Sequence, residues 1–352
     1  MPVARKPIPA EAWVLSGATG VAVVALSVVR LVSGGASQFF ATGDPRLFLL
    51  TTRDLFGTGH GFAALGFAAE IPYRYGRMGL PLLAWLLAAG RPALVAWTLI
   101  GINLVALTAI PGLAAVLLDD HDAPPRAAAW ILVLPAFVVL FGNVFSDPLV
   151  IALLLVAYLL ERRSRRGSAL ALLAFAVLVK EIAVLALIPL LYRAARERTA
   201  RDAGAVAITL VPYALWCSWL RWRVGAFPFL ADTEARRGAL GLPFAAFMHT
   251  LAHRTGDDTV LLAIVVVTIA LGATGAWLAR GTLIGGLAAV YTLVSVCIGS
   301  EGLRLFGEGL RVLLIPQVFG MLAIAVGVHA RKVAGEDPVH PALPEHREPA
   351  PV

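Results

Sequence analysis

Charge is scarce in this chain, and lysine is nearly missing from it. Charged residues make up 14% of the 352 positions, and only three of the 29 basic residues are lysine. Residues 12–33 contain no acid at all. Hydrophobic residues instead make up 59% of the chain, and the mean hydropathy is +0.82. A soluble core of this size does not need so much apolar surface, so the composition predicts a polytopic membrane protein.

Several kinds of site are excluded by what the sequence lacks. The two cysteines, Cys217 and Cys297, both lie inside apolar stretches, which argues against a disulfide framework and against a thiolate metal site. There is no Walker loop, no dinucleotide fingerprint and no zinc-type histidine pattern. The net charge of +7 comes without an interleaved aromatic and basic patch. We therefore expect no cofactor, no metal and no nucleic-acid partner.

The chain divides into apolar stretches bounded by charge, proline or glycine. They run over residues 12–33, 78–90, 93–118, 127–145, 147–160, 168–179, 182–192, 204–222, 259–279, 282–300 and 311–330. In lipid, helices satisfy their own backbone groups, so the stretches predict an all-α transmembrane bundle. We expect about ten membrane helices, with 78–90 too short for a full crossing.

We expect one membrane domain over residues 1–332 and a tail over residues 333–352. Within the domain, the polar segments 34–77 and 223–258 are predicted to be the first and second outer loops. The tail is rich in proline and glutamate and has no apolar periodicity, which predicts a disordered cytoplasmic segment.

Arginine clusters at residues 162–166 and 193–201 predict the orientation in the membrane. By the positive-inside rule both clusters are cytoplasmic, as are the two termini, and we expect a multi-pass protein of a bacterial plasma membrane. Residues 168–192 must then enter the bilayer and return, with Lys180 and Glu181 at the turn. Each half is roughly 18 Å of helix, well short of a bilayer core of roughly 30 Å. The alternative is a single span, with one cluster outside.

Asp44 is the first candidate for chemistry. It lies in Gly43-Asp44-Pro45, just after the first apolar stretch, where a carboxylate meets both water and the edge of the lipid. A general base needs that location if its substrate is half lipid and half polar. Asp before Pro is also ordinary turn chemistry, so a turn or cap role is the alternative.

The end of the first polar segment gathers Glu70, Tyr73, Arg74 and Arg77. Aromatic and cationic residues at this level often anchor a protein at the membrane interface. The same residues suit a phosphate site made of arginine, with a tyrosine platform for a sugar ring. The two interpretations are compatible.

Lys180 interrupts an apolar run, at a cost of roughly 2.5 to 3.5 kcal/mol for membrane insertion. It is expected either to bind phosphate in an outward cavity or to pair with the neighbouring Glu181. Asp147 precedes Pro148 and is expected to cap a helix or to orient a cation. Arg311 opens the last apolar stretch, as an interface residue or as part of an outer site.

The order of four motifs resembles a known family. They are the segments 73–83, 145–149, 179–182 and 310–316, which read YRYGRMGLPLL, FSDPL, VKEI and LRVLLIP. This order is similar to that of the lipid-linked-sugar-dependent GT-C glycosyltransferases, and among them to bacterial mannosyltransferase-like proteins, over roughly residues 10–330. The resemblance implies that Asp44 is the catalytic carboxylate and that Lys180 binds the donor phosphate. Family members often carry two adjacent acids, whereas this chain has only Asp44 at that point.

The resemblance implies transfer of a sugar from a polyprenyl-phosphate carrier to a glycan or lipid acceptor on the outer face, as part of cell-envelope synthesis. In that interpretation Asp44 takes the acceptor proton, while Lys180 with Arg74 or Arg77 stabilises the departing phosphate. Two alternatives remain open. One is a transporter or flippase for an anionic or lipid-linked substrate, and the other is a non-catalytic GT-C-like membrane protein.

Overall fold

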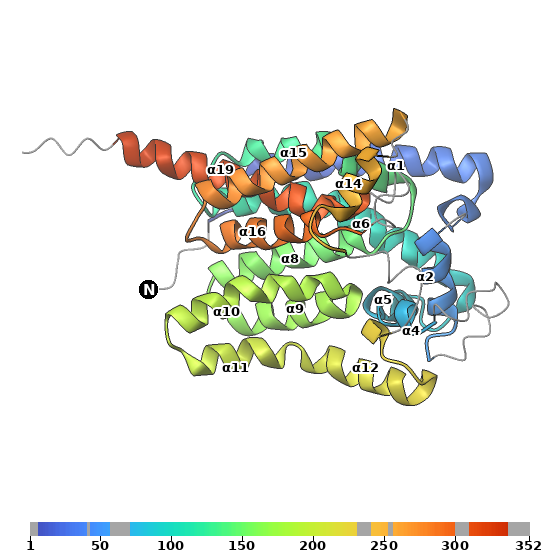
Figure 1. Cartoon of the computed structure of the whole chain (residues 1–352). Helices are drawn as coiled ribbons and strands as arrows, with labels where there is room; N and C mark the ends of the chain where they lie inside the picture. The colour runs from blue at the N-terminus through green and yellow to red at the C-terminus, as the bar shows by residue number, and fades with distance from the viewer. Residues whose placement is uncertain are drawn as a thin grey trace, which may run out of the picture.

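The secondary structure is helical throughout the part of the chain that the structure describes. A computed structural model describes residues 6–40, 43–56, 71–230, 241–252, 256–299 and 310–336, and no strand occurs in them. The long helices run side by side along one direction, so the bundle has two ends (Figure 1). We call them the Asp44 end, at the right of Figure 1, and the arginine-loop end, at the left, where the turns 119–126, 162–166 and 196–200 lie.

The long apolar helices form the body of the bundle. They include α1 (Ala10–Gly34), α6 (Pro92–Asp119), α15 (Gly256–Leu278) and α19 (Leu314–Glu336). Five described segments are long and apolar enough to cross a membrane: Ala10–Gly34, Pro92–Asp119, Ala200–Val224, Thr259–Leu278 and Leu314–Gly335. Exposed Trp13, Val21 and Val32 line the outer face of α1, as expected for a face in contact with lipid. The all-α part of the prediction is confirmed for the described residues, and the five apolar segments are consistent with a membrane protein.

Shorter helices connect and cover the long ones. They are η1 (Ala36–Phe40), α2 (Gly43–Arg53), α4 (Ile71–Tyr75), α5 (Gly79–Leu87), η3 (Pro125–Val133), α7 (Pro135–Val139), η4 (Leu140–Gly142), α8 (Asp147–Arg162), α9 (Arg166–Val179), η5 (Glu181–Ala186), α10 (Leu187–Arg196), α11 (Ala200–Ile208), α12 (Val211–Val224), η6 (Pro228–Leu230), α14 (Ala245–Ala252) and α16 (Leu283–Val296). With nine residues, α5 is too short to cross, as expected for 78–90.

Two boundaries differ from the prediction. The stretch 127–145 is not one helix but the succession η3, α7 and η4, because Pro135 has no N–H to donate to the preceding turn. At the other terminus, α19 continues to Glu336, so residues 333–336 are helical and not part of a disordered tail. Residues 337–352 lie outside the described residues.

Residues 166–196 form the predicted hairpin. From the arginine-loop end α9 leads to Lys180, and η5 with α10 returns. Nη1 of Arg166 lies 2.9 Å from Oδ1 of Asp202, and Arg193 pairs with Glu161. Both arginine clusters therefore lie at the same end of the molecule, and the alternative of a single span over 168–192 is wrong.

Close helix packing fixes the start of α19. A Cβ added to Gly275 of α15 would lie 2.5 Å from the carbonyl oxygen of Gly320, so the two backbones are in direct contact. Farther along the same interface, Gln317 donates a 2.8 Å hydrogen bond to the hydroxyl of Thr268. This interface holds in place the chain just before α19, where Arg311 lies.

Candidate active site

Asp44 lies at the centre of a buried group of arginines. It occupies the first turn of α2 and is 4% exposed. Arg74 donates a hydrogen bond to its Oδ1, Nη2 of Arg311 lies 2.6 Å from its Oδ2, and Nη1 of Arg77 lies 3.7 Å from the same oxygen. Three distant parts of the sequence thus meet at one carboxylate. We call Asp44, Tyr73, Arg74, Arg77, Glu181 and Arg311 the Asp44 cluster.

The charge state of Asp44 follows from these contacts. Burial by itself would raise the pKa of the Asp44 carboxyl, but the positive charges of Arg311, Arg74 and Arg77 together lower that pKa well below its ordinary value. Asp44 is therefore ionised at neutral pH. With these guanidiniums in place its carboxylate binds a proton only weakly.

Arg77 is held by a second carboxylate. Its Nη2 donates to Oε1 of Glu181 at 2.7 Å and its Nε donates to Oε2 at 3.0 Å, which is the two-point geometry that a guanidinium makes with a carboxylate. The same Nη2 also donates to the hydroxyl of Tyr73. The Tyr73 ring contacts two guanidiniums, with the Cζ atoms of Arg77 and Arg74 at 4.7 and 5.3 Å from its centroid. The Tyr73 ring therefore stabilises the guanidinium groups of Arg74 and Arg77 through cation–π contacts.

A glycine and a tyrosine bring these segments together. A Cβ added to Gly79 would lie 2.5 Å from the backbone nitrogen of Val179, so only glycine lets α5 approach the end of α9 this closely. On the other side, the buried Tyr75 donates a 2.8 Å hydrogen bond to the carbonyl of Asp54, and Trp216 donates one of 2.7 Å to the carbonyl of Tyr75. Helix α4 is thereby fixed between α2 and α12.

Lys180 and Asp147 form a separate buried ion pair. Nζ of Lys180 lies 2.5 Å from Oδ1 of Asp147, whose side chain is 1% exposed. Lys180 has extended backbone, with φ −158° and ψ 125°, so successive side chains point to opposite sides. Lys180 therefore turns towards α8 while Glu181 turns towards Arg77.

Two sequence interpretations are corrected by this geometry. Lys180 does not pair with Glu181, because each has a different partner across the bundle. Asp147 does not cap α8, because it is the first helical residue and its N-cap neighbour Ser146 also makes no side-chain cap bond. Asp147 holds a cation, which was the other interpretation.

Sequence reasoning missed two members of this region. The sequence predicts Glu181 only as a partner for Lys180, although the alternation of an extended backbone separates the two side chains. Phe145 belongs to one of the four sequence motifs without a predicted role, yet the guanidinium of Arg311 lies over its ring at 4.7 Å from the centroid. No signal in the chain connects Phe145 with a residue so distant in sequence.

An apolar groove of about 410 Å³ adjoins the Asp44 cluster. It is lined by Phe56, Met78, Gly79, Leu82, Leu178, Pro212, Leu215, Trp216 and Trp219. Met78 directly follows Arg77 of the cluster, so charged and apolar surfaces meet within one turn of chain. The stacked rings of Trp216 and Trp219, with centroids 4.7 Å apart, form part of one wall.

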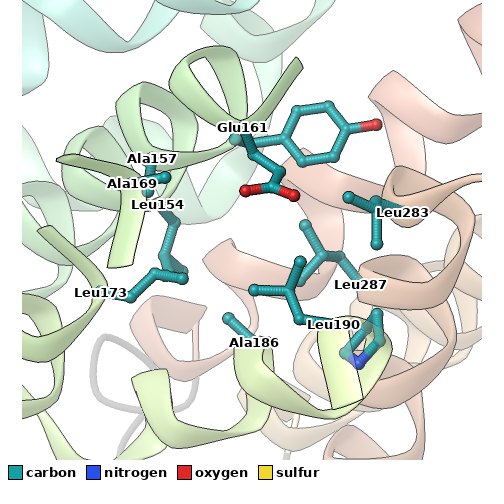
Figure 2. Close-up of a pocket in the computed structure, with 11 residues that line it drawn as sticks. Leu154, Ala157, Glu161, Ala169, Leu173, Ala186, Leu190, Leu283 and Leu287 are labelled. Atoms are coloured by element: carbon teal, nitrogen blue, oxygen red, sulfur yellow. The ribbon is translucent and has the colours of Figure 1, made fainter. Parts of the chain in front are cut away.

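A second cavity lies towards the arginine-loop end, between α8, α9, α10 and α16. Figure 2 shows the carboxylate of Glu161 among apolar side chains that include Leu190 and Leu287. The cavity measures about 30 Å³, which is room for water molecules but not for a substrate. The pair that Glu161 makes with Arg193 accounts for its charge. We assign this cavity a structural role only.

The predicted residues thus fall into two groups. Asp44, Tyr73, Arg74, Arg77 and Arg311 meet in one cluster, whereas Lys180 and Asp147 form a pair beside it. Glu70 lies outside the described residues. Among the described residues, no group of three or more histidine, cysteine, aspartate or glutamate side chains is placed to hold a metal ion. No protein family model, curated protein or solved structure matches this chain.

Proposed function

We propose that this protein is a membrane glycosyltransferase of GT-C type, which moves a sugar from a polyprenyl-phosphate carrier to an acceptor at the Asp44 end. One observation carries the proposal: an ionised, buried carboxylate is surrounded by three arginines directly beside an apolar groove. A substrate for such a place has a compact anionic head and a long apolar chain.

The two surfaces suit the two parts of such a donor. Guanidinium groups bind phosphate oxygens in the geometry they use for carboxylates, so Arg74, Arg77 and Arg311 suit the phosphate. The groove walled by Trp216 and Trp219 suits the first isoprene units, since burying apolar chain contributes about 0.8 kcal/mol per CH₂ group. Because Arg77 and Met78 are adjacent in the chain, both parts of one molecule can bind at once.

In the proposed reaction, the acceptor oxygen attacks the anomeric carbon and its proton passes to Asp44. The bond between the anomeric carbon and the phosphate oxygen breaks, and the phosphate leaves with the electron pair. The arginines stabilise the charge that develops on the leaving oxygen. Lys180 is already neutralised by Asp147, so we assign the leaving-group role first to Arg74, Arg77 and Arg311.

The proposal also concerns the membrane. We propose that shorter helices, including α8, α9, α10 and α16, cross together with the five long segments, which gives about ten crossings of a bacterial plasma membrane. The arginine-rich turns would then be cytoplasmic and the Asp44 end would face outward. This places the reaction where a lipid-linked donor and an external acceptor meet.

Sugar transfer in proteoliposomes tests the proposal. The purified full chain is supplied with a panel of polyprenyl-phosphate sugars, and released polyprenyl phosphate is measured. We expect turnover with at least one donor and a loss of roughly 10²-fold or more in Asp44→Asn, the usual scale for removing a general base. Asp120→Asn is the matched control, because Asp120 pairs with Arg163 at the opposite end. No turnover with any donor, or equal turnover in Asp44→Asn, contradicts the proposal.

One observation favours transport as a second candidate. The chain is interrupted by extended backbone at Lys180 between two helices, a feature that transporters use near their binding sites. Movement of a labelled lipid-linked substrate across the bilayer without release of its sugar would identify a transporter. A glycosyltransferase releases the sugar without moving the lipid.

A further inference from the structure

We propose that the Asp44 carboxylate is the resident anion of a phosphate-type oxyanion site, so that an incoming phosphate must displace Asp44 from the guanidiniums of Arg74 and Arg311. This inference rests on the proposed function, because it takes the same arginines as phosphate ligands. The inference adds that Asp44 competes with the donor phosphate for the arginines. The donor must therefore bind before Asp44 can act as a base.

The competition follows from the chemistry of the guanidinium group. Its N–H donors form a planar fork that fits a carboxylate and a phosphate in the same way. Arg74 donates to Oδ1 of Asp44, and Arg311 lies 2.6 Å from Oδ2. A phosphate that bound both guanidiniums would need the positions that these two oxygens occupy, so Asp44 and phosphate exclude each other.

Glu181 and Asp44 hold their arginines differently. Glu181 takes Arg77 with hydrogen bonds of 2.7 and 3.0 Å to two separate oxygens. Asp44 instead divides its two oxygens among three guanidiniums, with Arg74 on Oδ1, Nη2 of Arg311 2.6 Å from Oδ2 and Nη1 of Arg77 3.7 Å from Oδ2. Arg77 is therefore fixed by a two-point contact with Glu181, whereas Arg74 and Arg311 each meet a single oxygen of Asp44, so another anion can exchange for Asp44 at these two guanidiniums.

Displacement changes what Asp44 can do. The positive charges beside it are the reason that its pKa is low, so it is a weak base while they remain. Once a phosphate takes the guanidiniums of Arg74 and Arg311, the carboxylate loses part of that stabilisation and its proton affinity rises. Asp44 then becomes able to accept the proton of an acceptor hydroxyl. The base is therefore active only when the donor phosphate is in place.

Phosphate binding by variants of the full chain tests the competition without any sugar transfer. The affinity for inorganic phosphate is measured by calorimetry in detergent, and that for polyprenyl phosphate in lipid nanodiscs. If Asp44 holds the arginines in more than about 90% of molecules, Asp44→Asn binds phosphate at least ~10-fold more tightly than the unaltered protein. Asp120→Asn, which removes an ion-paired carboxylate at the other end, leaves the affinity unchanged.

Whether Asp44→Asn binds phosphate more tightly or less tightly shows whether Asp44 competes with phosphate for the arginines. A gain with polyprenyl phosphate alone identifies a lipid head group as the ligand, and a gain with inorganic phosphate as well identifies a site for phosphate in general. Equal or weaker binding of both probes by Asp44→Asn overturns the inference, because Asp44 would then organise the arginines and not compete for them.

A second pair of variants covers the case in which Asp44→Asn does not fold. Arg311→Gln is compared with Asp44→Asn/Arg311→Gln, which leaves fewer uncompensated charges. The double variant is expected to bind phosphate more tightly than the single one, and weaker or equal binding overturns the inference. If the variants bind phosphate more tightly but the protein transfers no sugar, the inference that Asp44 competes with phosphate stands, and the proposal of a glycosyltransferase is wrong.

Discussion

The two ends of the bundle both carry ion pairs, but they treat charge differently. At the Asp44 end, the cations that pair with Asp44, which are Arg74, Arg77 and Arg311, are between 8% and 16% exposed. At the arginine-loop end, the cations that pair with acids, Lys6, Arg163, Arg166 and Arg193, are between 30% and 43% exposed. Both ends carry arginines, so the presence of arginine alone does not distinguish them.

The difference shows where the fold tolerates an energetic cost. An exposed ion pair contributes about 0–1 kcal/mol to the free energy of unfolding, because water and salt screen the attraction between its charges. Such pairs therefore need no functional explanation. Buried pairs lose the hydration of both partners, and a hydrophobic pair of similar volume is often as stable. The Asp44 end retains several such charges, which is the reason to look for function there.

The largest expected effect is on stability at Asp147. Asp147→Ala leaves Lys180 buried without its partner, which is expected to lower the free energy of unfolding by about 3–5 kcal/mol. Asp147→Leu combined with Lys180→Met removes both charges and should recover most of that loss. Arg163→Gln, which removes a cation that is 35% exposed from its pair at the opposite end, should change stability by about 1 kcal/mol or less.

The stabilities of these variants are compared by measuring their thermal unfolding in the same detergent. A loss in Asp147→Ala no larger than that in Arg163→Gln would show that the two ends do not differ in the way described. A double variant as unstable as Asp147→Ala would show that the packing around Asp147, and not its charge, is what matters.

Much of this arrangement follows from the sequence, and the remainder has a physical reason. Apolar stretches bounded by charge located the five segments that are long and apolar enough to cross a membrane, and the two arginine clusters correctly predicted the hairpin that turns at Lys180. The pairing of charges was harder to predict. Lys180 and Glu181 are neighbours in sequence, yet extended backbone sends them to Asp147 and Arg77, which only the packing of helices decides.

The same limit applies to the cluster around Asp44. The sequence marked Asp44, Arg74 and Arg311 separately, because each is a polar residue next to an apolar stretch. That they touch depends on the close approach of glycine-containing helices, such as α5 at Gly79, and spacing along the chain does not reveal it. Phe145 carries no polar signal at all, so its contact with Arg311 is visible only in three dimensions.

An intermediate effect is expected at Glu181. Glu181→Gln removes the negative charge from the two-point contact with Arg77 but keeps a similar shape, so stability should fall by about 1–2 kcal/mol. If Glu181 fixes Arg77 for the donor, the affinity for polyprenyl phosphate also falls. Unchanged affinity together with lower stability would limit Glu181 to a structural role.

The smallest effect concerns His121 at the arginine-loop end. Burial, aided by the charge of Arg162, lowers the pKa of His121 to about 4, and its ring stacks on Tyr158. Between pH about 6.5 and pH about 4, His121 is protonated in the unfolded chain but neutral in the folded protein. The free energy of unfolding therefore falls as the pH drops through this range. Allowing for solvent screening, the loss is about 1 kcal/mol.

Melting temperatures of the unaltered protein and of His121→Asn between pH 7 and pH 4 measure this contribution. The difference between the two proteins should change across that window and level off below it. If the difference in melting temperature stays constant over this pH range, burial does not lower the pKa of His121. The surroundings of His121 would then be as hydrated as those of the arginines at this end.

The measurement that tests the central claim most directly is an experimental structure of the full chain with polyprenyl phosphate in lipid nanodiscs. We expect the phosphate at the Asp44 end, within hydrogen-bond distance of Arg74 and Arg311, with Asp44 displaced from them and the first isoprene units in the groove beside Trp216 and Trp219. A phosphate bound instead among the exposed arginines of the opposite end, with the Asp44 cluster unchanged, would contradict the account.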